Sequence, residues 1–320
     1  MVKITFFGTP SFAVTSLERL IAAGEEVVAV VTRPDRPRGR GHRLQPSPVK
    51  TTALAHGIQV LQPDRVEDLG FAAVVAASNA DLGVVAAYGK ILPDVILQIP
   101  RHGTNNVHAS LLPRYRGAAP VHRAIIAGEQ ETGVTIIRLV REMDAGPMLA
   151  HSVRPIADDE TSEVVERALA EAGADLLVST VSEISSGRAQ ETPQDHALAT
   201  FAPRLAKEDG RIDWTEPARA IHNLVRGLHP WPHAYTFLGG SRYLILETGV
   251  LDPATPAPAR APGEIIDAEG DRLHVVCAKG TVLAIYALQP EGRRPLPPRA
   301  FLAGRPITLP AIFRQSASTE

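Results

Sequence analysis

Cysteine is almost absent from this chain of 320 residues, since Cys277 is the only one. A single cysteine excludes an internal disulfide framework and suits a protein of the reducing cytoplasm. The residues around Cys277, in LHVVCAKG, alternate as they do in a strand. We therefore expect a buried structural thiol rather than a nucleophile.

Long apolar segments are missing as well. No stretch approaches the roughly 20 consecutive apolar residues that span a bilayer, and the N-terminus, MVKITFFGTPSF, lacks the apolar run of a signal peptide. Hydrophobic residues make up 44% of the chain, which is an ordinary value for a globular protein. The formal net charge of −2 does not indicate a nucleic-acid coat or a membrane surface. We expect a cytoplasmic protein.

Lysine is scarce, because only 5 of the 33 basic residues are lysines and 28 are arginines. This bias runs through the whole chain, so an isolated arginine indicates little about function. Only a local cluster of arginines, weighed against nearby acidic residues, indicates a binding surface.

Apolar runs alternate with helical patterns in the first half of the chain. Near-continuous apolar strands separated by helices indicate a mostly parallel, doubly wound sheet of the Rossmann-like type, whose ligands bind beyond the carboxyl ends of the strands. Strands are expected at 2–7, 26–32, 58–62, 80–89, 105–110, 133–140 and 148–156, and helices at 11–24, 48–57 and 158–184.

The second half has a different pattern. Periodicity is lost over 189–205, which is the composition of a linker, and a helix is expected at 217–228. Short strands follow, with a hairpin around Gly239-Gly240, and a Pro-rich surface loop is expected at 252–263. This indicates a small β-barrel domain. We expect a first domain at 1–188, a linker at 189–205 and a barrel domain at 206–314.

Several motifs of common enzymes are absent. Gly8-Thr9-Pro10 follows the first strand, but the dinucleotide fingerprint G-x-G-x-x-G is missing, which argues against a dehydrogenase. No histidine or cysteine spacing indicates a metal site, and no serine or cysteine nucleophile stands in a recognisable motif. If the chain is an enzyme for acyl transfer, its substrate has to supply the nucleophile.

The stretch TNNVHASLLPRYRGAAP, from Thr104 to Pro120, is dense in polar groups. Asn106 and His108 are two residues apart, so both would point to one face of a strand. An amide and an imidazole together can hold an oxyanion and move a proton, although Asn-x-His at a strand end often only caps a loop. Asp144, in a Gly-Pro loop, could orient the imidazole or could simply form an Asx-turn.

A basic run follows the second strand between residues 32 and 50, with Asp35 as its only acidic residue. A run of charge is usually a solvated loop, but this one follows the carboxyl end of a strand, on the side where ligands bind. A phosphate backbone there would need cations. The basic residues are Arg33, Arg36, Arg38, Arg40, Arg43 and Lys50.

Several motifs together resemble the methionyl-tRNA formyltransferase family, in order and over nearly the whole chain. They are FFGTPSFA, TRPDRPRGRGHRLQPSPVK, AAYGKILP, NNVHASLLPRYRGAAPVHRAIIAGEQETGVTIIRLVREMDAGPMLA, IDW and HPWP. The Asn-x-His…Asp set with Ser-Leu-Leu-Pro is common to folate-dependent formyltransferases. The basic loop and the C-terminal domain narrow the resemblance to the tRNA enzymes.

The resemblance implies a reaction and a set of site residues. The donor would be 10-formyltetrahydrofolate, the acceptor the amino group of methionyl initiator tRNA, and the product N-formylmethionyl-tRNA for translation initiation. Catalysis would fall to Asn106, His108 and Asp144. Our own default expectation is a monomer, and the spacing of His and Cys predicts no metal. The folate would lie against Ser110, Leu111, Leu112, Pro113, Tyr88, Gly89 and Leu92, and the tRNA against Arg36, Arg38, Arg40 and Arg43, with an OB-like C-terminal barrel holding its flank.

Other functions remain open at this point. A formyltransferase could act on another amine, such as a purine-pathway ribonucleotide or a nucleotide sugar, or serve as a folate hydrolase module. A tRNA-binding protein without activity is the alternative from a different class, although it would not need Asn106, His108 and Asp144. Purine-pathway enzymes lack a comparable C-terminal domain and the arginine-rich loop, so these two features discriminate.

Overall fold

The computed structural model describes residues 1–38, 43–251 and 260–317 of the chain. They form two compact units. Unit 1 comprises Met1–Pro120, Glu131–Pro155 and Glu166–Pro203, and unit 2 comprises Val121–Gln130, Ile156–Val165 and Arg204–Glu320. The loop expected at 252–263 lies largely outside the described residues.

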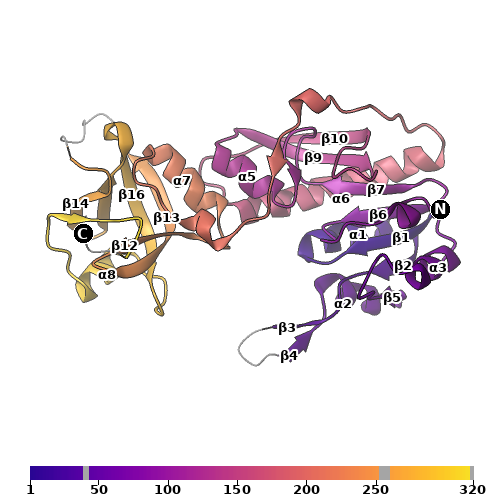
Figure 1. Cartoon of the computed structure of the whole chain (residues 1–320), viewed down its shortest axis with the longest axis horizontal. Helices are drawn as coiled ribbons and strands as arrows, with labels where there is room; N and C mark the ends of the chain where they lie inside the picture. The colour runs from indigo at the N-terminus through magenta and orange to yellow at the C-terminus, as the bar shows by residue number, and fades with distance from the viewer. Residues whose placement is uncertain (39–42, 252–259, 318–320) are drawn as a thin grey trace. The chain divides into compact units, whose positions relative to one another are not determined.

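A seven-stranded sheet forms the centre of unit 1, in the order β10-β9-β7-β6-β1-β2-β5 (Figure 1). Its strands are β1 (Lys3–Gly8), β2 (Glu26–Val31), β5 (Val60–Leu61), β6 (Leu82–Ala86), β7 (Thr104–His108), β9 (Glu131–Arg138) and β10 (Met148–Pro155). The pairs from β7 through β6, β1 and β2 to β5 are parallel, whereas β7–β9 and β9–β10 are antiparallel. The expectation of a mostly parallel sheet is confirmed.

Helices cover this sheet on both faces. They are α1 (Ser11–Ala22), α2 (Pro48–Ala55), α3 (Leu69–Ala77), α4 (Asp94–Leu97) and α6 (Ser162–Ser185), whose residues up to Val165 belong to unit 2. Helix α5 (Pro120–Ala127) belongs to unit 2 apart from Pro120. Side chains of α3 and α4 pack with Val85 of β6. Gly173 of α6 lies against Val107 of β7, on the opposite face. Apolar residues on alternate positions of β6 and β7 therefore meet a helix on either side.

Local sequence explains where several helices begin. Ser47 accepts a hydrogen bond from the Lys50 N–H, and Pro48 occupies the first turn of α2, where its missing N–H has no cost. Asp68 caps α3 in the same way through the Gly70 N–H. The long helix expected at 158–184 begins later, at Ser162, because residues 157–160 form a turn in which Glu160 accepts from the Ala157 N–H.

Unit 2 is built on an antiparallel sheet in the order β12-β13-β16-β15-β14-β17. Its elements are β12 (Ala234–Leu238), β13 (Ser241–Leu251), β14 (Glu264–Glu269), β15 (Arg272–Val276), β16 (Val282–Pro290), β17 (Ala311–Ile312), α7 (Ala218–Gly227) and α8 (Pro298–Gly304). The predicted hairpin joins β12 to β13 through Gly239 and Gly240, which both have positive φ.

The two edges of this sheet meet. Phe237 of β12 exchanges two backbone hydrogen bonds with Arg314, two residues after β17. The sheet thus curls into the small barrel expected from the sequence. Its interior holds Trp214, Phe313 and Cys277 among aliphatic side chains. Burial raises the pKa of the Cys277 thiol to about 12, and the expectation of a buried structural cysteine is confirmed.

Residues of the expected linker, 189–205, make specific contacts within unit 1. Thr192 pairs with Met148 of β10. Phe201–Ala202, as strand β11, pairs in parallel with β8 (Arg116–Gly117), just beyond the polar motif. Within the described part of the chain, no helix is both long and apolar enough to cross a membrane.

Candidate active site

Asn106 and His108 lie on one face of β7, next to the centre of the sheet. Asn106 pairs with Val85 of β6, and His108 lies two residues after Asn106. The side chains of Asn106 and His108 therefore project from the same face as Val85, which α3 and α4 cover farther along the sheet. His108 is the last residue of the strand and is buried, with 5% of its surface exposed. The polar pair therefore stands at the carboxyl end of a parallel strand, where α/β sheets bind ligands.

The loop after β9 folds back over this face and brings Asp144 to both residues. The Asp144 Oδ1 atom lies 3.4 Å from the Asn106 Nδ2 atom, and its Oδ2 atom lies 3.6 Å from the His108 Nδ1 atom. The carboxylate is 13% exposed, so water screens it only partly. The amide and the imidazole of β7 thus meet the carboxylate of a residue that lies 38 positions after Asn106.

The backbone places Asp144 through an unusual conformation. Its φ is 50°, in the left-handed region that aspartate tolerates better than most residues. The Gly117 N–H donates a 2.9 Å hydrogen bond to the Asp144 Oδ2 atom. Gly117 itself has a φ of 117°, and a Cβ there would come within 2.9 Å of the Ala202 carbonyl oxygen. Only glycine combines this backbone conformation with so close an approach.

Both nitrogens of the His108 ring face oxygen acceptors. The Nε2 atom lies 3.0 Å from the Tyr115 carbonyl oxygen, and the Nδ1 atom faces the Asp144 carboxylate. A neutral imidazole can donate to only one of these oxygens, whereas an imidazolium can donate to both. The separation of 3.6 Å on the Nδ1 side is longer than a hydrogen bond, so this nitrogen is not committed to Asp144.

The Ser-Leu-Leu-Pro segment is fixed to β9 by Thr135. The Thr135 hydroxyl donates to the Ser110 carbonyl and accepts from the Leu112 N–H, at 2.7 and 3.2 Å. The Ser110 hydroxyl donates to the Arg114 carbonyl. Leu112 is buried, while Leu111 and Pro113 are half-buried. The segment is a rigid wall directly after His108.

The segment after β6 supplies the neighbouring wall. Tyr88 and Leu92 are core side chains, and burial raises the pKa of the Tyr88 hydroxyl to about 12. Arg33, two residues after the end of β2, donates to the Gly89 carbonyl and ties the two segments together. Ile91, in contrast, is 78% exposed. The side chains of Tyr88 and Leu92 are therefore not available to a ligand, and the apolar side chain at the surface is that of Ile91.

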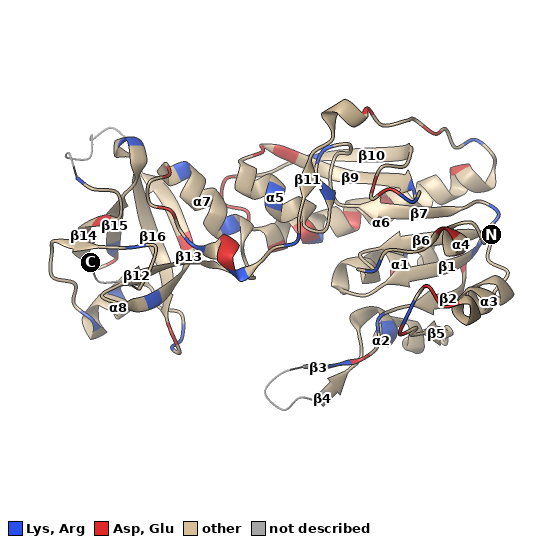
Figure 2. Cartoon of the chain, viewed as in Figure 1, with Lys and Arg blue, Asp and Glu red and all other residues tan. Residues whose placement is uncertain are grey.

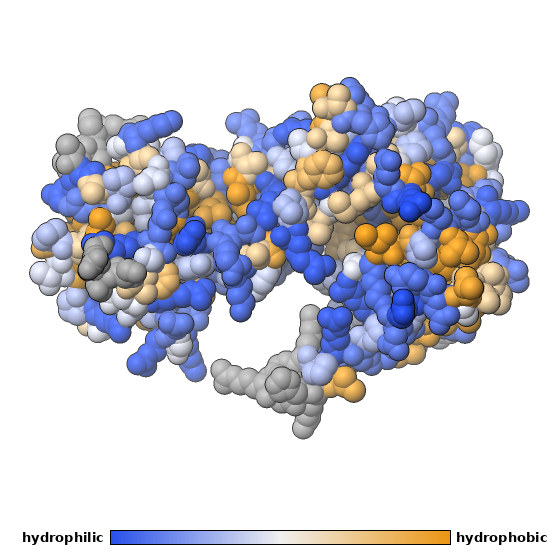
Figure 3. Space-filling model, viewed as in Figure 1, coloured by the Kyte–Doolittle hydropathy of each residue, from blue (hydrophilic) through white to orange (hydrophobic). Residues whose placement is uncertain are grey.

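Further apolar side chains are exposed in unit 1. Val140 and Met143 flank the turn before Asp144, and Leu69 and Val74 lie on α3. Figure 3 shows apolar surface gathered over α3. Exposed apolar groups beside a polar site suit a flat aromatic ligand, and neither Val140 nor Met143 had a sequence signal that distinguished it from core residues.

The basic run after β2 divides into two groups. Lys50 binds Asp35 and Gln62 at 2.7 Å each, and its hydrogen bond is the main cause that lowers the pKa of Asp35. Lys50 and Arg33 thus anchor the base of the loop. The hairpin strands β3 (Arg36–Arg38) and β4 (Arg43–Gln45) carry Arg36, which is exposed, together with Arg38 and Arg43. Arg40 lies outside the described residues.

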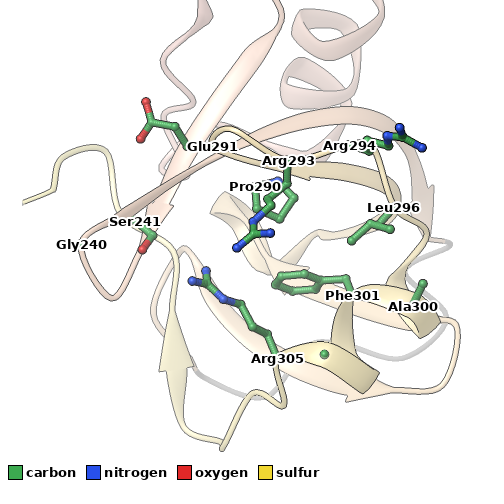
Figure 4. Close-up of a pocket in the computed structure, with 11 residues that line it drawn as sticks. Gly240, Ser241, Pro290, Glu291, Arg293, Arg294, Leu296, Ala300, Phe301 and Arg305 are labelled. Carbon is green, nitrogen blue, oxygen red and sulfur yellow. The ribbon is translucent and has the colours of Figure 1, made fainter.

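Unit 2 has a cavity of about 640 Å³ between the turn after β16 and the end of α8. Three arginines and one glutamate line it, namely Arg293, Arg294, Arg305 and Glu291. Figure 4 shows the guanidinium groups of Arg293 and Arg305 turned toward each other, whereas Arg294 is turned away. Arg305 donates a 2.6 Å hydrogen bond to the Tyr243 hydroxyl, which holds its side chain in place without neutralising its charge.

Charges elsewhere in both units are mixed. Figure 2 shows basic and acidic residues interspersed over the secondary structure. Arg272 and Arg299 of unit 2, for example, are paired with Asp267 and Asp271. Residues 206–314 contain 13 basic and 11 acidic residues. The cavity is therefore a local basic surface that the overall charge of this segment does not reveal. Among the residues that the structure describes, no group of three or more His, Cys, Asp or Glu is arranged to hold a metal ion.

Two family models match the chain. The model described as formyl transferase covers residues 2–181, and that described as formyl transferase, C-terminal domain, covers 204–306. With the parallel sheet and its amide, imidazole and carboxylate, these matches define an enzyme of the formyltransferase class.

Relatives narrow this class. Methionyl-tRNA formyltransferase from Pelobacter propionicus is 48% identical over 305 residues, which cover 95% of this chain and 94% of the relative. The enzyme of the same name from Moorella thermoacetica is 45% identical, over 96% and 97% of the two chains. The chain belongs to the methionyl-tRNA formyltransferase family.

Solved structures share the fold at low identity. An N-formyltransferase from Helicobacter canadensis, in complex with folinic acid and dTDP-3-aminofucose, has a TM-score of 0.66 and 17% identity, over 91% of this chain and 100% of its own. Glycinamide ribonucleotide transformylase 1 from Symbiobacterium toebii has a TM-score of 0.51 and 20% identity, and it matches 61% of this chain.

Proposed function

We propose that this protein transfers the formyl group of 10-formyltetrahydrofolate to the amino group of methionyl initiator tRNA. The observation that carries the proposal is the convergence of Asn106, His108 and Asp144 at the end of β7, in a chain 43–48% identical to methionyl-tRNA formyltransferases over nearly its full length. Such a substrate places the reaction in the cytoplasm.

Asn106 and His108 stabilise the charge that develops in the reaction. The Asn106 amide has two N–H donors, and its single contact with Asp144 is long, so one donor is available to a substrate oxygen. The His108 Nδ1 atom is the second donor on the same face. Donors already in place cost no reorganisation when the oxygen of the formyl group becomes negative, and this is the main source of rate enhancement in acyl transfer.

The proton that the attacking amine loses has to be transferred as well, and Asp144 is placed for this step. The ordinary pKa of an α-amino group is about 7.7–8.0, so a sizeable fraction is neutral near pH 7.5. As the bond between the amine nitrogen and the formyl carbon forms, the amine proton passes to the Asp144 carboxylate. The bond between the formyl carbon and the folate nitrogen then breaks, and the leaving nitrogen takes that proton. The carboxylate faces the His108 Nδ1 atom and keeps the imidazole ring oriented during this step.

The folate supplies the formyl group, and this chain supplies walls that fit its aromatic part. Ser110 to Pro113 form one wall, and the backbone from Tyr88 to Leu92, with the exposed Ile91 side chain, forms the other. Met143, beside Asp144, extends the apolar surface. We also propose that Gly89 and Leu111 contact the folate.

The tRNA is bound by basic surfaces of both units. In unit 1, Arg36, Arg38, Arg40 and Arg43 contact the end of the acceptor stem, because a flexible polyanion is held by several cations that displace its counterions. In unit 2, residues 206–314 form the RNA-binding domain. We assign its phosphate contacts to Arg293 and Arg305, whose guanidinium groups face one cavity (Figure 4). Planar forks of this type suit phosphate oxygens.

The test is an assay of formyl transfer with radiolabelled formyl-folate and purified protein. Charged initiator tRNA should be formylated, whereas uncharged initiator tRNA should not, because it lacks the amine. A purine-pathway ribonucleotide amine and an amino sugar nucleotide serve as competing acceptors. Faster transfer to either of these than to methionyl-tRNA would overturn the proposal, and tight tRNA binding without any transfer would favour a binding protein.

A further inference from the structure

The side-chain amide of Gln194 connects the Asp144 loop to a buried arginine. Its Nε2 atom donates to the carbonyl oxygens of Asp144 and Gly146, at 2.8 and 2.7 Å. Its Oε1 atom accepts from the Nε and Nη2 atoms of Arg116, at 3.1 and 2.6 Å. Gln194 and Arg116 are both buried, each with 5% of its surface exposed.

These contacts fix the orientation of the amide. Both neighbours of the Oε1 atom are donors that cannot accept, and both neighbours of the Nε2 atom are carbonyl oxygens that cannot donate. A flipped amide would lose four hydrogen bonds at once. Arg116 therefore sets the direction of Gln194, and Gln194 in turn holds the loop.

Asp144 is consequently held at two ends. Its carboxylate receives the Gly117 N–H, and its carbonyl receives the Gln194 amide. Arg116 and Gly117 are adjacent in β8, so one short strand controls both attachments. The φ of 50° at Asp144 is unfavourable by itself and persists only because surrounding bonds determine it.

We propose that Gln194 and Arg116 are positioning residues of the formyl-transfer reaction, which keep the Asp144 carboxylate aligned with His108 and Asn106. The proposal rests on the proposed function, since it acts through that catalytic set. Neither residue has to touch a substrate. Both polar groups of Gln194 are used within the protein, so its loss should change turnover rather than substrate binding.

The main test compares Gln194→Ala with the wild-type protein. We expect kcat to fall about 10- to 100-fold, as the loss of a group that orients a reacting residue usually does, and KM for tRNA and for the folate to stay within about 2-fold. Gln194→Glu is the second variant, in case Gln194→Ala does not fold. It has the same shape and keeps the bonds from Arg116, but its carboxylate cannot donate to the two carbonyl oxygens, so we expect a similar fall in kcat.

A double-mutant cycle separates positioning from general stability. In an Asp144→Ala background, Gln194→Ala should cost less than about 2-fold further in kcat, because the group that it positions is gone. Thr236→Ala is the matched control for lost hydrogen bonds. Buried Thr236 also makes two, one from the Trp214 indole and one to the Arg314 carbonyl, in unit 2. The Thr236→Ala variant should have a lower melting temperature and an unchanged kcat.

Two results would overturn the positioning role. One is a wild-type kcat in Gln194→Glu. The other is a loss in the Asp144→Ala background as large as the loss in the wild type. A failure of the proposed function looks different, because the wild-type protein itself would then not formylate methionyl-tRNA.

Discussion

The two units assemble the residues of their proposed sites in different ways. In unit 1, Asn106 and His108 come from one strand, and Asp144 comes from a loop only 38 residues away. In unit 2, Arg293 and Arg305 come from a turn and from the end of a helix, and neither lies in a motif with a chemical meaning. The first arrangement can be predicted from the sequence, whereas the second forms only when the barrel folds.

The units also differ in how strongly the loss of one polar residue should affect the reaction. The buried polar groups of the proposed catalytic set are held by hydrogen bonds within unit 1, and a single misplaced group should have a large effect on rate. Arg293 and Arg305 are instead exposed at a cavity of unit 2, and their proposed contacts with tRNA would act through charge. Charge–phosphate contacts are individually weak and depend on salt. The following predictions, from the largest effect to the smallest, test this contrast.

The largest effect should follow the loss of the imidazole. His108→Ala should lower kcat about 100-fold or more, because it removes a positioned donor. The measurement is steady-state formylation of methionyl-tRNA. His151→Ala, an exposed histidine of β10 in the same sheet, is the matched control and should keep the wild-type rate. Near-normal turnover of His108→Ala would exclude His108 from the mechanism.

A smaller effect, on binding instead of turnover, should follow removal of the cavity arginines. Arg293→Ala with Arg305→Ala should raise KM for tRNA about 10-fold with little change in kcat. It should also reduce the slope of log Kd against log salt by roughly one for each lost phosphate contact. Filter binding at several salt concentrations measures this slope.

The matched control is Arg272→Ala with Arg299→Ala. It changes the net charge of unit 2 equally, but each of these arginines is already paired with a carboxylate. Equal losses of affinity in the two double variants would show that only the net charge of unit 2 matters. The cavity arginines would then not form a specific tRNA site.

The smallest effect concerns the stability of unit 2 at low pH. Burial lowers the pKa of His222, whose Nδ1 atom contacts the Thr248 hydroxyl and whose Nε2 atom contacts the Asp158 carbonyl. The unfolded chain therefore binds a proton more readily than the folded chain. The free energy of unfolding should be highest above the ordinary pKa of about 6.5 and should fall as the pH drops below it. Burial lowers the pKa values of His233 and His274 as well, so they act in the same direction.

Tryptophan fluorescence can follow this effect in unit 2 alone, because Trp214 and Trp231 are the only tryptophans of the chain and both lie there. Urea unfolding at pH 7.5 and at pH 5.5 should show the loss of stability in the wild type. His222→Gln should show a smaller difference between the two values. If the substitution leaves the difference unchanged, the pH dependence belongs to other groups, and His151→Gln in unit 1 serves as the control.

Much of the architecture followed from patterns along the chain. The alternation of apolar runs and helices predicted the mostly parallel sheet, and Gly239-Gly240 predicted the hairpin of the barrel, because two residues with positive φ match the twist of adjacent strands. The helix expected at 158–184 was placed within a few residues of its ends. These features depend on local conformational preference and on burial of one face, which neighbouring residues determine.

The contacts of the catalytic residues were less predictable. The segment 189–205 lacks periodicity, which is typical of a linker, yet Gln194 within it binds the Asp144 loop. Tyr88 and Leu92 were expected at the folate, but their side chains pack in the core, and Ile91 is the exposed neighbour. A sequence pattern does not distinguish an apolar residue that faces the core from one beside it that faces a site.

The sequence by itself determined the chemistry of the chain, since an amide, an imidazole and a carboxylate act through their own functional groups wherever they meet. It also determined the order of strands and helices, which depends on interactions between residues close along the chain. Only the tertiary structure decided the rest: the turn of Asp144 toward His108, the amide that holds it, and the meeting of Arg293 with Arg305 at one cavity. These depend on distances between residues far apart in the sequence, and such distances are fixed only when the cores of both units are packed.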